Sequence, residues 1–238
     1  MESYEAKRLT EKPNGFNSYV PVFILTAVFI VILVLSEIFN LIDIGLFDEI
    51  NGGVNMDMIL SVLRYNVFYK VSYLLLILYV LFFRKIVVGA FVLPIIYAVV
   101  GVNYIFRIIE LTKSVFNASG YVSGDTAYNL IMNSVFLVLC ILMAFTAFKG
   151  FRPKAVVIVS TIVICGYEIY NLIRFFITMP SAEDLAQMGI DFDIKMLFSN
   201  ICTFLIPVLF FVILMLIGIN KNTPSVIEAL NKHEKKTS

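Results

Sequence analysis

The sequence predicts an all-α, polytopic membrane protein with six transmembrane helices and with both chain ends in the cytoplasm. Three observations lead to this class. First, 60% of the 238 residues are hydrophobic and 15% are charged, and the mean hydropathy is +0.93, which is outside the range of soluble domains. Second, apolar runs long enough to cross a bilayer core recur along the chain. Third, lysine and arginine gather in alternate connections between these runs.

Six apolar runs have the length expected of a span. They are residues 19–42, 67–83, 86–111, 127–148, 155–177 and 196–219. The second run is the shortest, and Asn55 is suited to cap a helix that begins at Met56 and continues into it. Residues 1–18 lack the n-region and h-region of a cleavable signal, so we expect a cytoplasmic N-terminal segment there. Residues 19–219 then form the membrane domain, and residues 220–238 form a cytoplasmic tail.

Lysine and arginine predict the orientation, because cytoplasmic loops of membrane proteins carry an excess of positive charge. Most of these residues lie in the N-terminal segment, in the turns at 84–85 and 149–154, and in the tail. The other loops hold only Arg64, Lys113 and Lys195, and they hold most of the acidic residues. The N-terminus and the C-terminus are therefore predicted to face the cytoplasm.

Two connecting segments carry helix-start signals. In the third outer loop, Ser181 precedes AEDLAQMG, in which Asp184 is placed to complete a capping box. In the tail, Thr223-Pro224 precedes the amphipathic stretch SVIEALNKH, whose basic end suits an anionic inner leaflet. A solvated tail without regular structure is an equal alternative.

With this orientation, the polar residues of the spans gather in the outer half of the membrane. The candidate ligand-binding residues are Glu37, Asn103, Arg107, Glu110, Tyr167, Glu168, Tyr170, Asn171 and Arg174. Several are three, four or seven residues apart and so share a helix face. An ionised group that faces lipid costs at least about 2.5 to 3.5 kcal/mol at the bilayer centre. We therefore expect these faces to line a polar pocket that opens outward and is closed below by apolar residues.

Other interpretations of the same residues remain open at this stage. Charged groups near helix ends, such as Lys70, Glu110 and Arg174, can reach the headgroups along their own side chains. Asparagines can hydrogen-bond between helices without any ligand, and tyrosines can belong to an interfacial aromatic belt. The stretch GYEIYNLIRFF at 166–176 would then be only the outer end of a helix.

Catalysis is not expected. The single histidine, His233, lies in the tail, and there is no H-E-x-x-H, no G-x-S-x-G and no phosphate-binding glycine loop. Cys140, Cys165 and Cys202 lie in apolar runs without metal-ligand spacing, so we expect reduced core thiols and no metal or cofactor. The net charge of +1 gives no reason to expect a nucleic-acid partner.

These observations favour a transporter or permease component that binds a small polar or amphiphilic solute. Arg107 and Arg174 would hold an anionic group, Glu37 and Glu168 would balance it or bind an amine, and the tyrosines of the fifth span would line the wall. Transport would be coupled to ions or would depend on an ATPase or other membrane subunit at the basic inner turns. The alternative is a non-transporting accessory, such as a sensor, immunity protein or assembly partner, that binds a protein or a lipid headgroup. The richness in Ile, Phe, Asn and Lys indicates a bacterial inner or plasma membrane.

Overall fold

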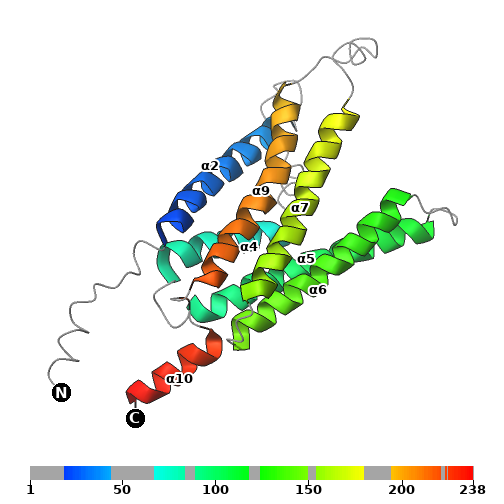
Figure 1. Cartoon of the computed structure of the whole chain (residues 1–238). Helices are drawn as coiled ribbons and strands as arrows, with labels where there is room; N and C mark the ends of the chain where they lie inside the picture. The colour runs from blue at the N-terminus through cyan, green and yellow to red at the C-terminus, as the bar shows by residue number, and fades with distance from the viewer. Residues whose placement is uncertain are drawn as a thin grey trace, which may run out of the picture.

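The computed structural model describes residues 19–43, 67–83, 89–117, 124–149, 154–179, 194–220, 223 and 225–237, and every regular element in these ranges is helical (Figure 1). The helices are α2 (Val20–Asp43), α4 (Val67–Leu78), the π-helix η3 (Tyr79–Phe83) that continues α4, α5 (Gly89–Asn117), α6 (Gly124–Lys149), α7 (Lys154–Thr178), α9 (Ile194–Ile219) and α10 (Val226–Thr237). The all-α prediction is confirmed for this part of the chain.

The chain is a multi-pass membrane protein, because 5 of its helices are long and apolar enough to cross a bilayer. These are α2, α5, α6, α7 and α9. The remaining predicted span corresponds to α4 and η3, whose apolar part, Val67–Phe82, is shorter than the other candidates. The sixth span and the orientation of the helices stay predictions. The expected helix start at Met56 and the expected cap at Ser181 lie outside the described residues.

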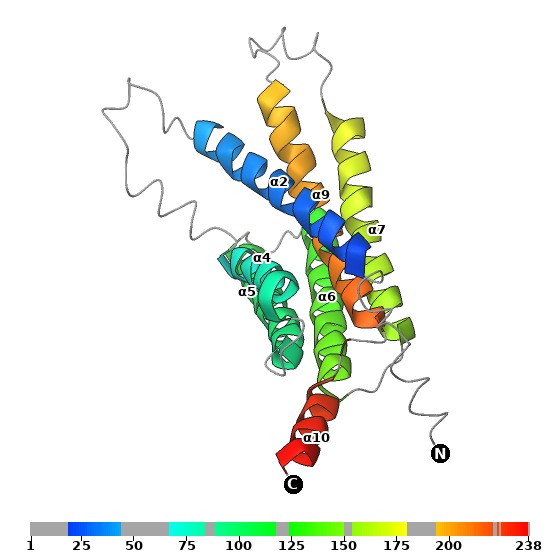
Figure 2. The same ribbon diagram turned by 90° about the vertical axis from the view of Figure 1, so that its left-hand side faces the viewer.

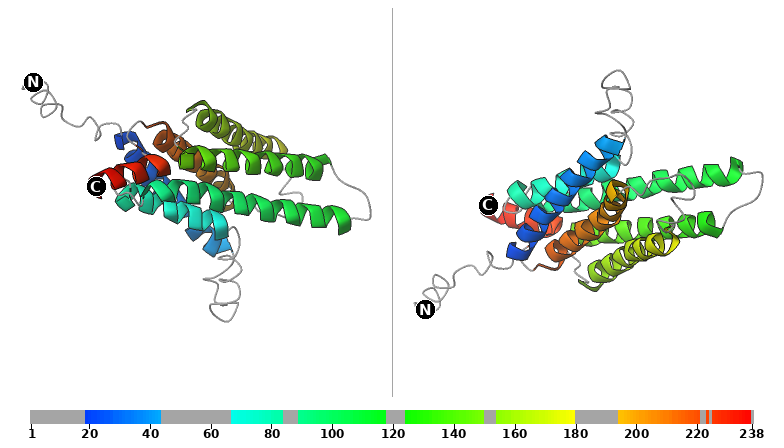
Figure 3. Two further views of the ribbon diagram at one scale, coloured as in Figure 1. Left: turned by 90° about the horizontal axis from the view of Figure 1, so that it is seen from below. Right: turned by 90° about the horizontal axis from the view of Figure 1, so that it is seen from above.

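The membrane helices pack as two groups. In the first, called here the α5 group, α6 lies along α5, and α4 packs on α5 (Figure 2). In the second, the α9 group, α9 packs against both α2 and α7. Views along the bundle show α5 and α6 running side by side (Figure 3). Close backbone approaches between the groups are sparse and involve mainly α6 with α7 and α2 with η3.

Buried aromatic rings connect the two groups through the core. The ring contacts run from Phe210 and Phe29 to Tyr73, then through Tyr69, Tyr104 and Phe136 to Tyr167. We call this series the aromatic chain. It crosses between the groups twice, where Phe29 and Phe210 meet Tyr73 and where Phe136 meets Tyr167 at a centroid distance of 5.0 Å. Such pairs each contribute about 0.5 to 1.5 kcal/mol beyond their area burial.

The tail forms a helix that fastens the two groups at one end of the bundle. Helix α10 begins with a capping box, in which the Ser225 amide donates to the Glu228 carboxylate and the Glu228 amide donates to the Ser225 hydroxyl. The predicted amphipathic helix is therefore present and extends to Thr237. Helix α10 packs on α6 and α5 (Figure 2), and the Thr223 hydroxyl just before it is 2.9 Å from the Tyr19 hydroxyl, which precedes α2.

Two glycines allow a direct test of the packing inside the α9 group. A Cβ at Gly218 of α9 would lie 3.2 Å from Val157 Cγ1 of α7, whereas a Cβ at Gly166 of α7 would have nothing within 4 Å. We predict that Gly218→Val destabilises the protein by about 1 to 3 kcal/mol, because the added methyl groups force α7 and α9 apart. The matched control Gly166→Val should melt close to wild type. Thermal melting followed by circular dichroism of the detergent-solubilised protein measures both, and equal melting temperatures would contradict this packing.

A second test addresses the predicted orientation. Lys113 of α5 and Lys149 of α6 are exposed and belong to opposite ends of the α5–α6 hairpin. We predict that Lys113→Cys reacts with a membrane-impermeant maleimide on right-side-out vesicles, and that Lys149→Cys reacts only after permeabilisation. The native thiols of Cys140, Cys165 and Cys202 are buried, so their background labelling should be low. If only Lys149→Cys were labelled on sealed vesicles, the orientation in the membrane would be the opposite of the predicted one.

Candidate functional site

Two of the candidate polar residues lie near the midpoints of membrane-spanning helices. Glu168 is close to the middle of α7, so about 15 Å of helix separates it from the C-terminal end of the helix at Thr178. Asn103 is close to the middle of α5. A glutamate side chain is too short to reach the headgroups from this depth, so the helix-end interpretation does not account for Glu168.

Arg107 and Glu168 bring opposite charges together across the boundary between the groups. Arg107 comes from α5, is half-buried, and its guanidinium carbon lies 5.4 Å from the centroid of the Tyr69 ring. Glu168 comes from α7, is half-buried, and is close enough to Arg107 to interact with it electrostatically. Both charges also act on Tyr69 and Tyr73 of α4. The α5 group and the α9 group thus each supply one charge to the same region.

Two polar groups in this region have hydrogen-bonding capacity that the described part of the chain does not fill. The Glu168 carboxylate makes no hydrogen bond or ion pair there, and it interacts with Arg107 electrostatically. The side chain of Asn103 is 4% exposed, and its Nδ2 has no hydrogen-bond partner within the same ranges. Leaving a buried polar group unsatisfied costs about 1 to 3 kcal/mol, so such groups call for an explanation beyond stability.

We call this region the central cluster. It consists of Arg107, Tyr167 and Glu168 with the neighbouring rings of Tyr69, Tyr73 and Tyr104. We include Asn103, because it lies one turn before Arg107 on the same face of α5. Tyr167 ties the cluster to α6, because its hydroxyl donates to Asn129 Oδ1 at 2.8 Å and its ring meets Phe136 edge-on. Asn171 is half-buried beside the Tyr167 hydroxyl.

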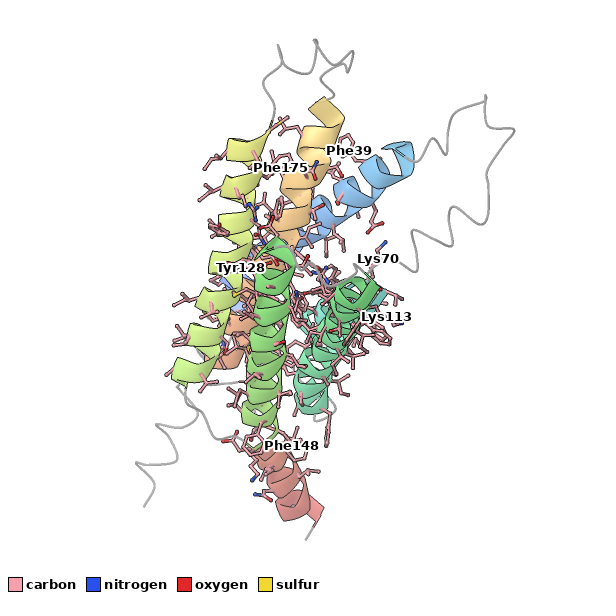
Figure 4. The ribbon with its side chains drawn as sticks, turned by 90° about the vertical axis from the view of Figure 1, so that its right-hand side faces the viewer. Phe39, Lys70, Lys113, Tyr128, Phe148 and Phe175 are labelled. Atoms are coloured by element: carbon pink, nitrogen blue, oxygen red, sulfur yellow. The ribbon has the colours of Figure 1, made fainter. Side chains whose placement is uncertain are left out.

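Two ion pairs bridge the groups outside the central cluster. Lys70 of α4, labelled in Figure 4, pairs with Glu37 of α2 at 3.0 Å. Both side chains are partly buried. Arg174 of α7 pairs with Asp125 of α6 at 3.0 Å, and both side chains are well exposed. We call them the outer ion pairs. Glu37 and Arg174 therefore already have protein partners of opposite charge.

The outer part of the fifth-span stripe does not have the interior position expected from sequence. Tyr170 is 50% exposed, and the Arg174 side chain is 44% exposed, so the expectation of an interior position is wrong for both. The reason is that this part of α7 runs beside the first turns of α6, where Asp125 holds Arg174 and Tyr128 contacts Tyr170. Glu110 is also exposed. The stretch GYEIYNLIRFF thus begins in the core and finishes as a helix end.

Sequence reasoning did not include the tyrosines of α4 and α5 in the site. Tyr69 and Tyr73 are four residues apart and so share a helix face, which is the same signal that identified the other stripes. Tyr104 directly follows Asn103 and is 2% exposed. Asn129 and Asp125 had no comparable signal, because their roles depend on which helix lies beside the start of α6.

The described residues contain no group of three His, Cys, Asp or Glu side chains placed to hold a metal ion. The chain matches no protein-family model, no curated protein and no solved structure. The function of the central cluster is therefore argued from its own chemistry.

The hydrogen bond of Tyr167 provides a test of the contact between the groups. We predict that Tyr167→Phe lowers the free energy of unfolding by about 1 kcal/mol, because Asn129 Oδ1 loses its donor. Tyr170→Phe is the matched control, since that ring is half-exposed and has only ring and electrostatic contacts. Thermal melting in detergent compares the two variants. If Tyr170→Phe were as destabilising as Tyr167→Phe, the hydrogen bond would not hold the groups together.

Proposed function

We propose that the chain is a transporter or permease component that binds a small polar or amphiphilic solute at the central cluster. One observation carries the proposal, namely that Arg107 and Glu168 bring opposite charges from two separately packed helix groups to the same region, well inside the helices α5 and α7. Stability alone gives little reason for such a pair, because apolar residues of similar volume often stabilise a core as well or better. Ionisable groups inside membrane domains commonly line substrate or ion pathways.

The packing of the helices supports transport over simple binding. The central cluster lies between the α5 group and the α9 group, whose helices contact each other sparsely. The outer ion pairs cross the boundary on one side of the cluster, and the tail crosses it at the other end of the bundle. A movement of one group against the other would expose the cluster to one face of the membrane at a time, as in transporters whose sites lie at the midplane.

In this proposal the chain works in a bacterial inner or plasma membrane and carries out no covalent chemistry. The energy would come from a coupled ion or from an ATPase or other membrane subunit docked on the basic inner turns. Lys149, at the end of α6, is exposed there with its ammonium 4.8 Å from the Phe145 ring centroid, which leaves it available to an acidic partner surface.

Ligand-dependent stability tests the proposal. A broad panel of metabolites is screened for solutes that raise the melting temperature of the purified wild-type protein, since a ligand at 100 times its Kd stabilises by about 2.7 kcal/mol. We expect at least one such solute, and we expect its effect to disappear in Arg107→Ala and in Glu168→Gln. Arg174→Ala is the matched control and should keep the effect, because Arg174 pairs with Asp125 outside the cluster. Uptake into proteoliposomes then tests transport itself.

The opposite result has a definite meaning. If no solute stabilises the protein and a stoichiometric membrane partner co-purifies with it, the chain is a non-transporting accessory. The same conclusion follows if Arg107→Ala and Glu168→Gln leave uptake unchanged.

A further inference from the structure

The acceptor at the centre of the bundle points to the chemical class of the solute. The Glu168 carboxylate has no hydrogen-bond donor within the described ranges, although it is half-buried near the middle of α7. A buried carboxylate is stabilised by a cation or by several donors. Arg107 lies close enough to act on this carboxylate electrostatically, and its guanidinium carbon lies 5.4 Å from the centroid of the Tyr69 ring.

Four tyrosines from three helices lie close enough to this acceptor to interact with its charge. Glu168 interacts electrostatically with Tyr69 and Tyr73 of α4, with Tyr104 of α5 and with Tyr167 of α7. The faces of such rings attract cations. Arg107 above Tyr69 at 5.4 Å shows that a ring of this cluster accommodates an organic cation.

We infer that the solute bears an ammonium group, held by the Glu168 carboxylate and by the tyrosine rings around it; this inference rests on the proposed function. The buried Asn103 Nδ2, which has no partner among the described residues, would donate to a hydroxyl or carbonyl oxygen of the same solute. The class is therefore a small amine that also carries an oxygen acceptor.

An anion or a metal ion fits these groups less well. An anion in this region would meet the negative charge of Glu168. A metal ion needs several oxygen ligands at short range, whereas the described residues contain no group of three His, Cys, Asp or Glu side chains placed to hold one. An ammonium group needs one carboxylate and aromatic faces, which the cluster provides as it stands.

Matched small molecules separate these classes. The probes share a three-carbon skeleton and differ in charge. 3-Amino-1-propanol carries an ammonium group, 1,3-propanediol carries no charge, 3-hydroxypropionate carries a carboxylate, and β-alanine carries both charges. Each probe is titrated against the purified full-length protein at pH 7, with thermal melting as the readout. Sodium chloride is titrated separately, at constant ionic strength and without choline.

We expect 3-amino-1-propanol to stabilise the wild type more than 1,3-propanediol and 3-hydroxypropionate do. In Glu168→Gln, which keeps the shape of the side chain, its apparent Kd should rise by at least about tenfold, because a charge-assisted hydrogen bond is lost. Glu110→Gln is the matched control and should bind as wild type does, since Glu110 is exposed on α5. Glu168→Asp should retain part of the binding.

Three results would overturn the inference. They are stabilisation by 3-hydroxypropionate but by neither amine, stabilisation by sodium ions that depends on Glu168, and an ammonium effect that survives Glu168→Gln. In the first two of these results, the central cluster still binds a ligand. The proposed function then stands, and only the inferred chemical class of the solute is wrong. If no probe stabilises the protein and the metabolite panel also gives none, the proposed function fails together with the class.

Discussion

The cost of exposing an ionised side chain to hydrocarbon is the constraint on which the rest of this structure depends. Arg107 and Glu168 lie on helices long and apolar enough to span a bilayer, and a charge at that depth costs at least about 2.5 to 3.5 kcal/mol when it faces lipid. Helices α5 and α7 must therefore turn these faces toward the bundle centre. The tyrosines of α4 and α5 complete the surroundings, because their rings bury apolar area while accepting a nearby charge.

The same constraint explains why contacts within and between the groups differ in kind. Within the groups, small residues let helices approach closely, as at Gly101, where a Cβ would lie 3.6 Å from Leu137 Cδ1, and at Gly218 beside Val157. Rings pack within the groups as well, as Tyr104 does on Phe136, but between the groups the contacts are mainly ring pairs such as Phe136 with Tyr167 and the outer ion pairs. Close packing of backbones is hard to rearrange, whereas long polar side chains and ring edges can change partners. The boundary is thus the part of the bundle most able to move.

The apolar runs of the sequence predicted the helices well, because the length of a span follows from the thickness of the bilayer. For α7, the run at 155–177 differs from the observed helix by one residue at each end. Pairing across the boundary was not accessible from sequence, since it depends on which helix faces meet. Glu168 was grouped with the residues of the outer half, although it lies near the middle of α7. Tyr170 and Arg174 were placed inside although α6 holds them near its first turns.

On the proposed function, the geometry of the charges also links binding to movement. Arg107 belongs to the α5 group and Glu168 to the α9 group, so their attraction pulls the groups together at the centre. An ammonium group bound to Glu168 would compensate its charge and weaken that attraction. The outer ion pairs and the tail would then carry a larger share of the force that holds the boundary closed. Occupancy of the central cluster would in this way lower the cost of separating the two groups, which is the coupling that a transporter needs.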